Sequence, residues 1–217
     1  MLFGTSVEQF SRWFDGAKAD ESIGAIVIDI NSPGGSVYGV QELSEKIYKA
    51  RGNKPIIAVV NSLMASAAYH IGSSADEIVI TPSGDVGSIG VFTVHTDLSE
   101  AAQKAGIKHT IIRAGEHKIE SNPVEPLSED AQFYIQKQVN DRYDLLVSDV
   151  ARNRNTNVSK VKDSYGKGRT LNAKDALSAG MVDRVGTLEQ VITQLFPKKK
   201  KNRTSNLKTR LEIEKRR

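Results

Sequence analysis

The chain has 217 residues and contains no cysteine, so disulfide bonds and thiolate chemistry have no part in its structure or activity. No apolar run approaches the ~20 residues of a membrane-crossing helix, and the start of the chain lacks the basic region and long apolar core of a secretory signal. The absence of cysteine is compatible with a reducing compartment. At the usual scale of about 100–200 residues per domain, the length predicts one domain with appendages.

The charge divides the chain into two parts. Residues 197–217 carry ten Lys or Arg against two Glu, whereas residues 1–196 carry 20 Lys plus Arg against 24 Asp plus Glu. We therefore expect a single, mildly acidic domain over residues 1–196 and a basic, disordered tail over residues 197–217. Contact between the tail and nucleic acid is the less favoured interpretation, because such charge runs are usually solvated termini.

The first part of the chain alternates between strand and helix patterns. Dense β-branched runs predict strands over residues 23–30, 55–60 and 77–80. Apolar residues at helical spacing, or a run of small residues, predict helices over 7–17, 37–50 and 65–75. Strands that alternate with helices pair in parallel through helical crossovers, so the pattern indicates an α/β fold with a parallel sheet and flanking helices.

The second part continues this pattern with longer helices. A helix over residues 97–107 is expected to start at Asp97 and to stop at Gly106. The elements predicted after it are a strand over 108–113, a polar loop over 114–127, a long helix from Ser128 to about Asn153, a helix over 171–179, a strand over 181–185 and a helix over 187–196.

The stretch NSLMASAAYHI, residues 61–71, contains the most informative serine of the chain. Ser66 lies where a hydrophobic strand gives way to a run of small residues. A serine at such a strand-to-helix corner exposes its Oγ and is well placed to act as a nucleophile. The same position suits a simple helix cap, and taken alone the pattern favours the cap, because serine caps are common.

Two glycine-rich loops have two interpretations each. Pro33-Gly34-Gly35 follows a predicted strand, and residues 81–91 contain three further glycines. Such loops present backbone N–H groups to a substrate carbonyl in some enzymes, but they are more often ordinary turns. A phosphate-binding loop is not favoured, because neither GxGxxG nor a GK[ST] ending occurs in the required context.

Candidate bases for Ser66 are few. The four histidines are His70, His95, His109 and His117, and no metal-binding pattern such as HExxH is present. A lone histidine is more often a surface or hydrogen-bonded structural group than a catalytic base. Sequence position alone therefore selects none of them.

Five motifs together resemble those of one peptidase family. They are INSPGGSV, NSLMASAAYHIGSSADEIV, GDVGSIGV, AGIKHTIIRAGEHK and NPVEPLSEDA, in this order and over roughly residues 5–190. This succession resembles the signal peptide peptidase family of serine peptidases, and within it the soluble phage prohead or head-maturation proteases. The resemblance implies a Clp protease/crotonase fold of repeated β-β-α units. It also implies catalysis by a serine and a lysine, without histidine, metal or cofactor.

The same resemblance assigns roles to five residues. The nucleophile is Ser66 from MASAAY, and the general base is Lys118 from AGEHK. Ser88 from VGSIG corresponds to the hydroxyl that orients the lysine. Gly34 and Gly35 from SPGG correspond to the amides that bind the oxyanion.

The sequence departs from the membrane-anchored members of the family beside the nucleophile. Ala67 and Ala68 follow Ser66 where those enzymes usually have glycines, a departure that the phage branch shares. We also expect the small residues around Ser66 to form a narrow pocket that accepts Ala or Leu.

The lysine poses a physical problem that assembly solves. A lysine amine is protonated in water at neutral pH, so it accepts a proton only where burial favours its neutral form. Lys118 lies in a polar loop. In the resembling enzymes adjacent subunits of a ring contribute the serine and the lysine, and we expect the same homo-oligomer here. The resemblance further implies protein or peptide substrates, with phage capsid or scaffold proteins as candidates, and a location in the host cytoplasm or the phage prohead.

Three other functions remain open at this point. One is a Clp-like Ser-His-Asp peptidase that uses His95 with Asp141 or Asp144. Another is a crotonase-like acyl-CoA enzyme, which the lack of an evident acid/base carboxylate pair in a glycine loop makes less favoured. The last is an inactive shell or scaffold protein, against which the intact Ser66 and Lys118 argue. Fold alone does not choose among these functions.

Overall fold

A computed structural model of the chain describes residues 4–196; residues 1–3 and the predicted tail, 197–217, lie outside the described part. A six-stranded sheet forms its centre. The strands are β1 (Ile26–Ser32), β2 (Ile56–Ala65), β3 (Glu77–Ile80), β4 (Asp85–Gly87), β5 (Thr170–Asn172) and β6 (Arg184–Val185). The helices are α1 (Val7–Ala19), α2 (Val40–Ala50), α3 (Ala67–Gly72), α4 (Ser99–Lys104), α5 (Glu129–Asn153), α6 (Val158–Ser164), α7 (Ala173–Ala179) and α8 (Leu188–Leu195), with a 3-10 turn, η1 (Gly166–Gly168).

Strand β2 organises the sheet. Its first half pairs in parallel with β1 on one side and β3 on the other, and its last three residues pair in parallel with β4. Strand β6 extends the sheet in parallel beyond β3, whereas the short β5 runs antiparallel to β4. Five consecutive residues of β2, 56–60, are buried, as expected for a strand covered on both faces. The predicted α/β fold with a parallel sheet is confirmed.

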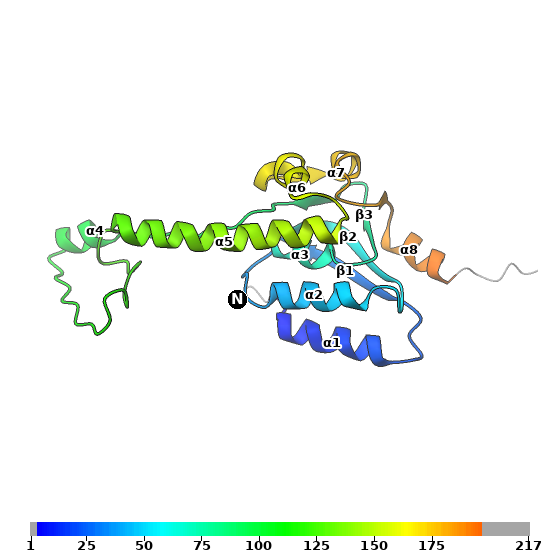
Figure 1. The fold of residues 1–217 in the computed structure, drawn as a ribbon, viewed down its shortest axis with the longest axis horizontal. Helices are drawn as coiled ribbons and strands as arrows, with labels where there is room; N and C mark the ends of the chain where they lie inside the picture. Colours follow the sequence, from blue (N-terminus) through cyan, green and yellow to red (C-terminus); the bar gives the residue numbers. More distant parts are fainter. Residues whose placement is uncertain (1–3, 197–217) are drawn as a thin grey trace, which may run out of the picture.

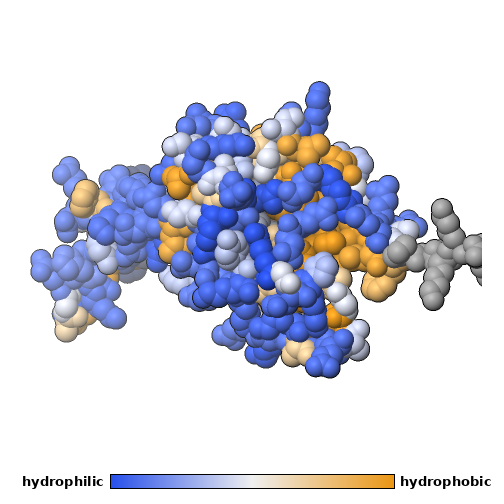
Figure 2. Space-filling view, turned by 45° about the vertical axis from the view of Figure 1, so that its right-hand side comes forward, coloured by the Kyte–Doolittle hydropathy of each residue, from blue (hydrophilic) through white to orange (hydrophobic). Residues whose placement is uncertain are grey.

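Helices cover both faces of this sheet (Figure 1). On one face, Leu43 and Ile47 of α2, Tyr69 of α3 and Val147 and Val150 of α5 share a buried core with the strands. On the other face, Val191 of α8 packs against Ile57, Val59 and Val79. Figure 2 shows apolar side chains gathered beside the end of the described chain, where α8 and its neighbours expose Val185, Ile192 and Phe196.

Helix α5 extends well beyond the sheet. Its 25 residues make it about 37 Å long at 1.5 Å per residue. It starts at Glu129, one residue after the predicted start, and the Ser128 side chain caps it by accepting a hydrogen bond from the Ala131 N–H at 3.2 Å. The start of α5, α4 and the intervening loop lie together at the end remote from the sheet (Figure 1). We call residues 92–135 the arm.

The arm contains the clearest error of the sequence prediction. The predicted strand over 108–113 is wrong, because these residues form no regular structure and all but Ile111 are exposed. Ile112 is 95% exposed. A strand requires a neighbouring strand to satisfy its N–H and C=O groups, and the described arm provides none.

Smaller differences concern the ends of elements. Strand β2 continues five residues beyond its predicted end, to Ala65, and α4 is shorter than predicted, starting at Ser99 and ending at Lys104. The predicted helix over 171–179 begins at Ala173, capped by the side chain of Asn172, which belongs to β5. Helix α6 and the strands β4 and β5 were not predicted. Within residues 4–196, no helix combines the length and apolarity that crossing a membrane requires.

Candidate active site

Ser66 occupies a sharp corner between β2 and α3. Its backbone has φ 54° and ψ −124°, a conformation that costs a non-glycine residue on the order of 1–3 kcal/mol. Hydrogen bonds fix it there: the Ser66 N–H donates to the Gly87 carbonyl at 2.8 Å, and the Ser66 carbonyl accepts from the His70 N–H at 3.0 Å. The side chain makes no capping hydrogen bond, so the helix-cap interpretation is wrong. The corner instead leaves the half-buried Oγ free, as a nucleophile requires.

The loop after β1 passes directly beside this serine. Gly34 has φ 98°, and a Cβ atom there would lie 2.6 Å from the Ser66 Cβ and 2.9 Å from the Ala65 carbonyl oxygen. Only glycine fits such an approach. The Gly34 N–H donates to Ser32 Oγ at 3.2 Å, whereas the neighbouring Gly35 N–H has no hydrogen-bond partner among residues 4–196. The geometry therefore favours a specific role for this loop over an ordinary turn.

The close approach of Gly34 to Ser66 makes a prediction about activity. Gly34→Ala should lower kcat/KM for a peptide substrate about 100-fold, because the added methyl displaces Ser66 or the loop, and displacements of about 1 Å have effects of that size. Gly24→Ala is the matched control. Gly24 lies outside the site and a Cβ there meets no atom within 4 Å, so activity should change little. Equal activity of Gly34→Ala and Gly24→Ala would show that the close approach of the loop to Ser66 is not needed for activity.

Ser88 lies close to the nucleophile through strand pairing. Ala65 at the end of β2 is opposite Gly87 at the end of β4, so Ser66 and Ser88 follow paired residues. Ser88 also has a positive φ of 52°, and its N–H donates to the Arg169 carbonyl at 2.9 Å. The structure thus brings the backbone positions of Ser66, Gly34 and Ser88 to one place.

Lys118 does not lie near Ser66 within one chain. Its side chain is exposed, and its N–H donates to the Gly115 carbonyl at 3.3 Å in a turn of the arm. Arg142 of α5 lies beside Ser66 in a common cavity, and the helix runs about 20 Å from there to its start at Glu129. The loop with Lys118 lies at that remote end (Figure 1). The role of Lys118 stays a prediction.

The alternative with His95 and Asp141 or Asp144 also fails to assemble within the chain. The His95 ring bonds through Nε2 to the Asn122 carbonyl at 2.9 Å, inside the arm. Asp141 and Asp144 form ion pairs with Lys137 and Lys162, both at 2.8 Å. None of these groups lines the cavity beside Ser66.

His117 belongs to an exposed group next to Lys118. A hydrogen bond to the Glu120 carboxylate raises the pKa of its imidazole. His117, Glu120 and Asp130 place one ligand atom each within 4.8 Å of one another. No metal was predicted, and exposed groups of this kind are common without an ion.

A buried pair that sequence reasoning missed lies behind Ser66. His70 is 4% exposed, and its Nε2 lies 2.9 Å from Asp149 Oδ2 of α5. Burial lowers the pKa of the imidazole in spite of the hydrogen bond to Asp149. A neutral ring then donates through Nε2–H to the carboxylate. The pair joins α3, which follows the nucleophile, to α5.

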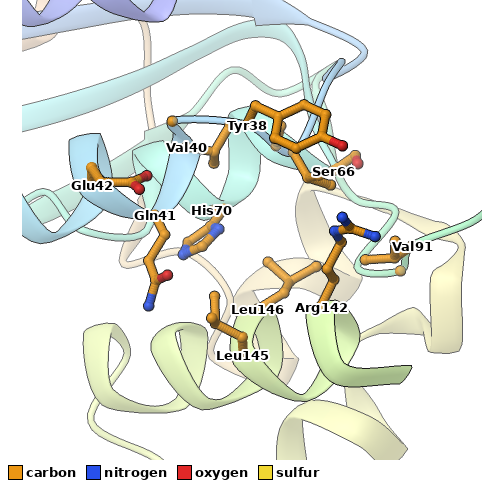
Figure 3. A pocket seen from close by; sticks show the side chains of 14 residues that line it. Tyr38, Val40, Gln41, Glu42, Ser66, His70, Val91, Arg142, Leu145 and Leu146 are labelled. Carbon is orange, nitrogen blue, oxygen red and sulfur yellow. The ribbon is translucent and has the colours of Figure 1, made fainter. Parts of the chain in front are cut away.

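A cavity of about 200 Å³ opens beside Ser66 (Figure 3). Its walls are formed by α2, α3, α5 and the segment after β4, with apolar side chains from Val40, Val91, Leu145 and Leu146. The polar groups at its edge include Arg142. The narrow pocket for Ala or Leu stays a prediction.

Comparison with known proteins identifies the family of the chain. Residues 49–202 match the model of peptidase family S49. The chain is 33% identical over 184 residues to the putative protease MJ0651 of Methanocaldococcus jannaschii, covering 83% of this chain and 58% of that protein. It is 28% identical over 177 residues to capsid assembly protease C of Escherichia phage lambda, covering 82% and 40%. The chain thus spans about half the length of these relatives.

Solved structures agree on the fold. A serine-to-alanine mutant of the 1510-N membrane-bound stomatin-specific protease has a TM-score of 0.55 and 16% identity, covering 86% of this chain and 76% of that chain. A lysine-to-alanine mutant of the same protease, in complex with a substrate peptide, has a TM-score of 0.53 and 17% identity, covering 86% and 72%. The predicted α/β fold of the Clp protease/crotonase type is confirmed. The chain belongs to peptidase family S49.

Proposed function

We propose that this chain is a serine endopeptidase whose nucleophile is Ser66. The observation that carries the proposal is the strained corner between β2 and α3, which holds a serine Oγ free of hydrogen bonds to the helix. Strain of this kind persists where surrounding structure fixes it, and it concentrates at functional sites. Membership of family S49 supports the same function.

The site suggests how the reaction proceeds. Ser66 Oγ attacks the peptide carbonyl while a base takes its proton, and the carbonyl oxygen becomes an oxyanion beside the Gly34–Gly35 backbone. The Gly35 N–H is available to bind it, and each such donor is worth about 3 kcal/mol of the barrier. The amine then leaves with a proton from the base. Water cleaves the acyl-enzyme and restores Ser66.

A lysine from a neighbouring copy supplies the base in this proposal. Lys118 lies on an arm that exposes apolar side chains, among them Phe92, Ile112 and Phe133. Exposed apolar residues gathered on one extension suit burial against another copy of the chain. Docking of the arm beside a neighbour's Ser66 would exclude water from the amine and favour its neutral form. Ser88, next to the nucleophile, would orient that amine.

The proposed substrates are capsid or scaffold proteins of a phage, cleaved in the host cytoplasm or the prohead. Similarity to the capsid assembly protease of phage lambda supports this choice. The site supports a peptidase more than the crotonase-like or inactive alternatives, because it holds a serine at a sharp corner beside a cavity that a substrate side chain can enter.

Serine-directed labelling tests the nucleophile. A fluorophosphonate should modify the assembled protein at Ser66 alone, as mapped by peptide mass, because only an activated serine reacts readily. Ser66→Ala is the control and should remain unlabelled. An acyl-CoA enzyme or an inactive shell would leave Ser66 unmodified, and that result would contradict the proposed function.

A further inference from the structure

An arginine stands at the edge of the Ser66 cavity. Arg142 projects from α5 toward Ser66 and Tyr38 (Figure 3). Its guanidinium lies 5.7 Å from the centre of the Tyr38 ring, and its Nη1 makes a 3.4 Å hydrogen bond to Gln138 Oε1. Arg142 is half-buried, and it is the one Lys or Arg among the described residues that line the cavity.

The charge of Arg142 is not neutralised by any carboxylate within residues 4–196. Among residues 4–196, no carboxylate lies within 4.0 Å of its guanidinium. The other arginines near the end of α5 differ: Arg152 pairs with Glu45 and with Asp149, and Arg154 pairs with Asp183 at 2.7 Å. Glu42 also lines the cavity, but it is exposed and lies on the opposite side of the view from Arg142 in Figure 3.

The surroundings favour a carboxylate as the missing partner. A guanidinium has five N–H donors, and the one weak bond to Gln138 leaves most of them free. Arginine binds carboxylates through two parallel charge-assisted hydrogen bonds, which are stronger where water is partly excluded. The apolar side chains of Val40, Leu145 and Leu146 can contact the methylene groups of an entering side chain.

We propose that Arg142 is a specificity-determining residue that selects an acidic substrate side chain on the amino side of the scissile bond. The inference rests on the proposed role of Ser66. The carbonyl that Ser66 attacks belongs to the residue on the amino side, so the side chain of that residue lies nearest to the adjoining cavity. An acidic side chain entering there would meet Arg142. A lysine or arginine would be repelled.

Peptides that differ at this one residue test the proposal. The substrate series carries Glu, Gln, Leu or Lys, and kcat/KM is measured per Ser66 titrated with fluorophosphonate. The assembled wild-type protein should prefer Glu over the isosteric Gln about tenfold, as one charge-assisted pair provides. Arg142→Gln should bring this ratio to about one, and Arg142→Glu should favour Lys over Glu.

Lys137→Gln is the matched control, since it removes one positive charge from the same helix outside the cavity. It should keep the wild-type ratio. Equal rates for Glu and Gln in the wild type, or an unchanged preference in Arg142→Gln, would overturn the inference while Ser66 remains labelled. Failure of Ser66 to react with fluorophosphonate would instead overturn the proposed function itself.

Discussion

Ser66→Ala should lower kcat for peptide hydrolysis about 10⁶-fold, the effect of removing the nucleophile from a serine protease. No other atom at the corner forms the acyl bond in the proposed reaction. The fold should persist, because alanine keeps the Cβ atom that packs beside Gly34 and the same backbone conformation. Turnover of a casein-like protein and the melting temperature measure the two effects. Turnover close to that of the wild type would remove Ser66 from the mechanism.

Ser66→Gly provides a physical control for this experiment. Both variants lack Oγ and should be inactive, but glycine adopts φ 54° without strain. Glycine loses more conformational entropy on folding than alanine does, and this offsets part of the strain that it relieves. We therefore expect Ser66→Gly to be more stable than Ser66→Ala by ~1 kcal/mol. In a protein of this size such a difference raises the melting temperature by roughly 2–4 °C. A higher stability of the inactive glycine variant would show that the strain is retained for function.

Strands β1, β2 and β3 could be predicted from the sequence because each contains a run of apolar residues, whereas the short β4 and β5 contain none. Residues 56–60 of β2 are buried on both faces, which is the condition that produces such a run. The same reasoning failed for residues 108–113. Their pattern suits a strand, but pairing depends on neighbours that are distant in sequence, and the arm has none in the described chain.

The candidate site could be predicted only in part. Ser66, Gly34 and Ser88 could be proposed because each lies in a motif shared with the resembling family, and the structure brings their backbones together. Arg142 and the His70–Asp149 pair were missed, because their positions depend on how α5 packs against α2 and α3. The sequence contained one signal for these residues. Helical spacing places two charged residues on the same face of α5 as two apolar ones: Arg142, Leu145, Leu146 and Asp149.

Lys118→Ala and Lys118→Arg should both be inactive, although each preserves the fold of the exposed arm. Arginine is protonated at any pH of interest and cannot accept the Ser66 proton. His95→Ala should retain most activity, because its ring bonds to Asn122 within the arm. These rates are measured with the same peptide substrate. Active Lys118 variants together with an inactive His95→Ala would favour the Clp-like triad instead.

The separation of Ser66 and Lys118 makes complementation the decisive experiment. Chains carrying Ser66→Ala are mixed with chains carrying Lys118→Ala, each inactive alone. If neighbouring copies share each site in a closed ring, random mixing leaves about one site in four with both groups intact. Mixtures should therefore regain about a quarter of wild-type activity. Dilution below the assembly concentration should abolish it, because the arm then loses its neighbour.

A second mixture controls for nonspecific rescue. Ser66→Ala chains combined with chains carrying both substitutions contain no intact serine, so they should remain inactive. Mass measurements establish that copies of both kinds share one particle. Co-assembled Ser66→Ala and Lys118→Ala chains that stay inactive would show that sites are not shared between copies. The arm would then have to fold back toward Ser66 of its own chain, against the direction in which α5 carries it.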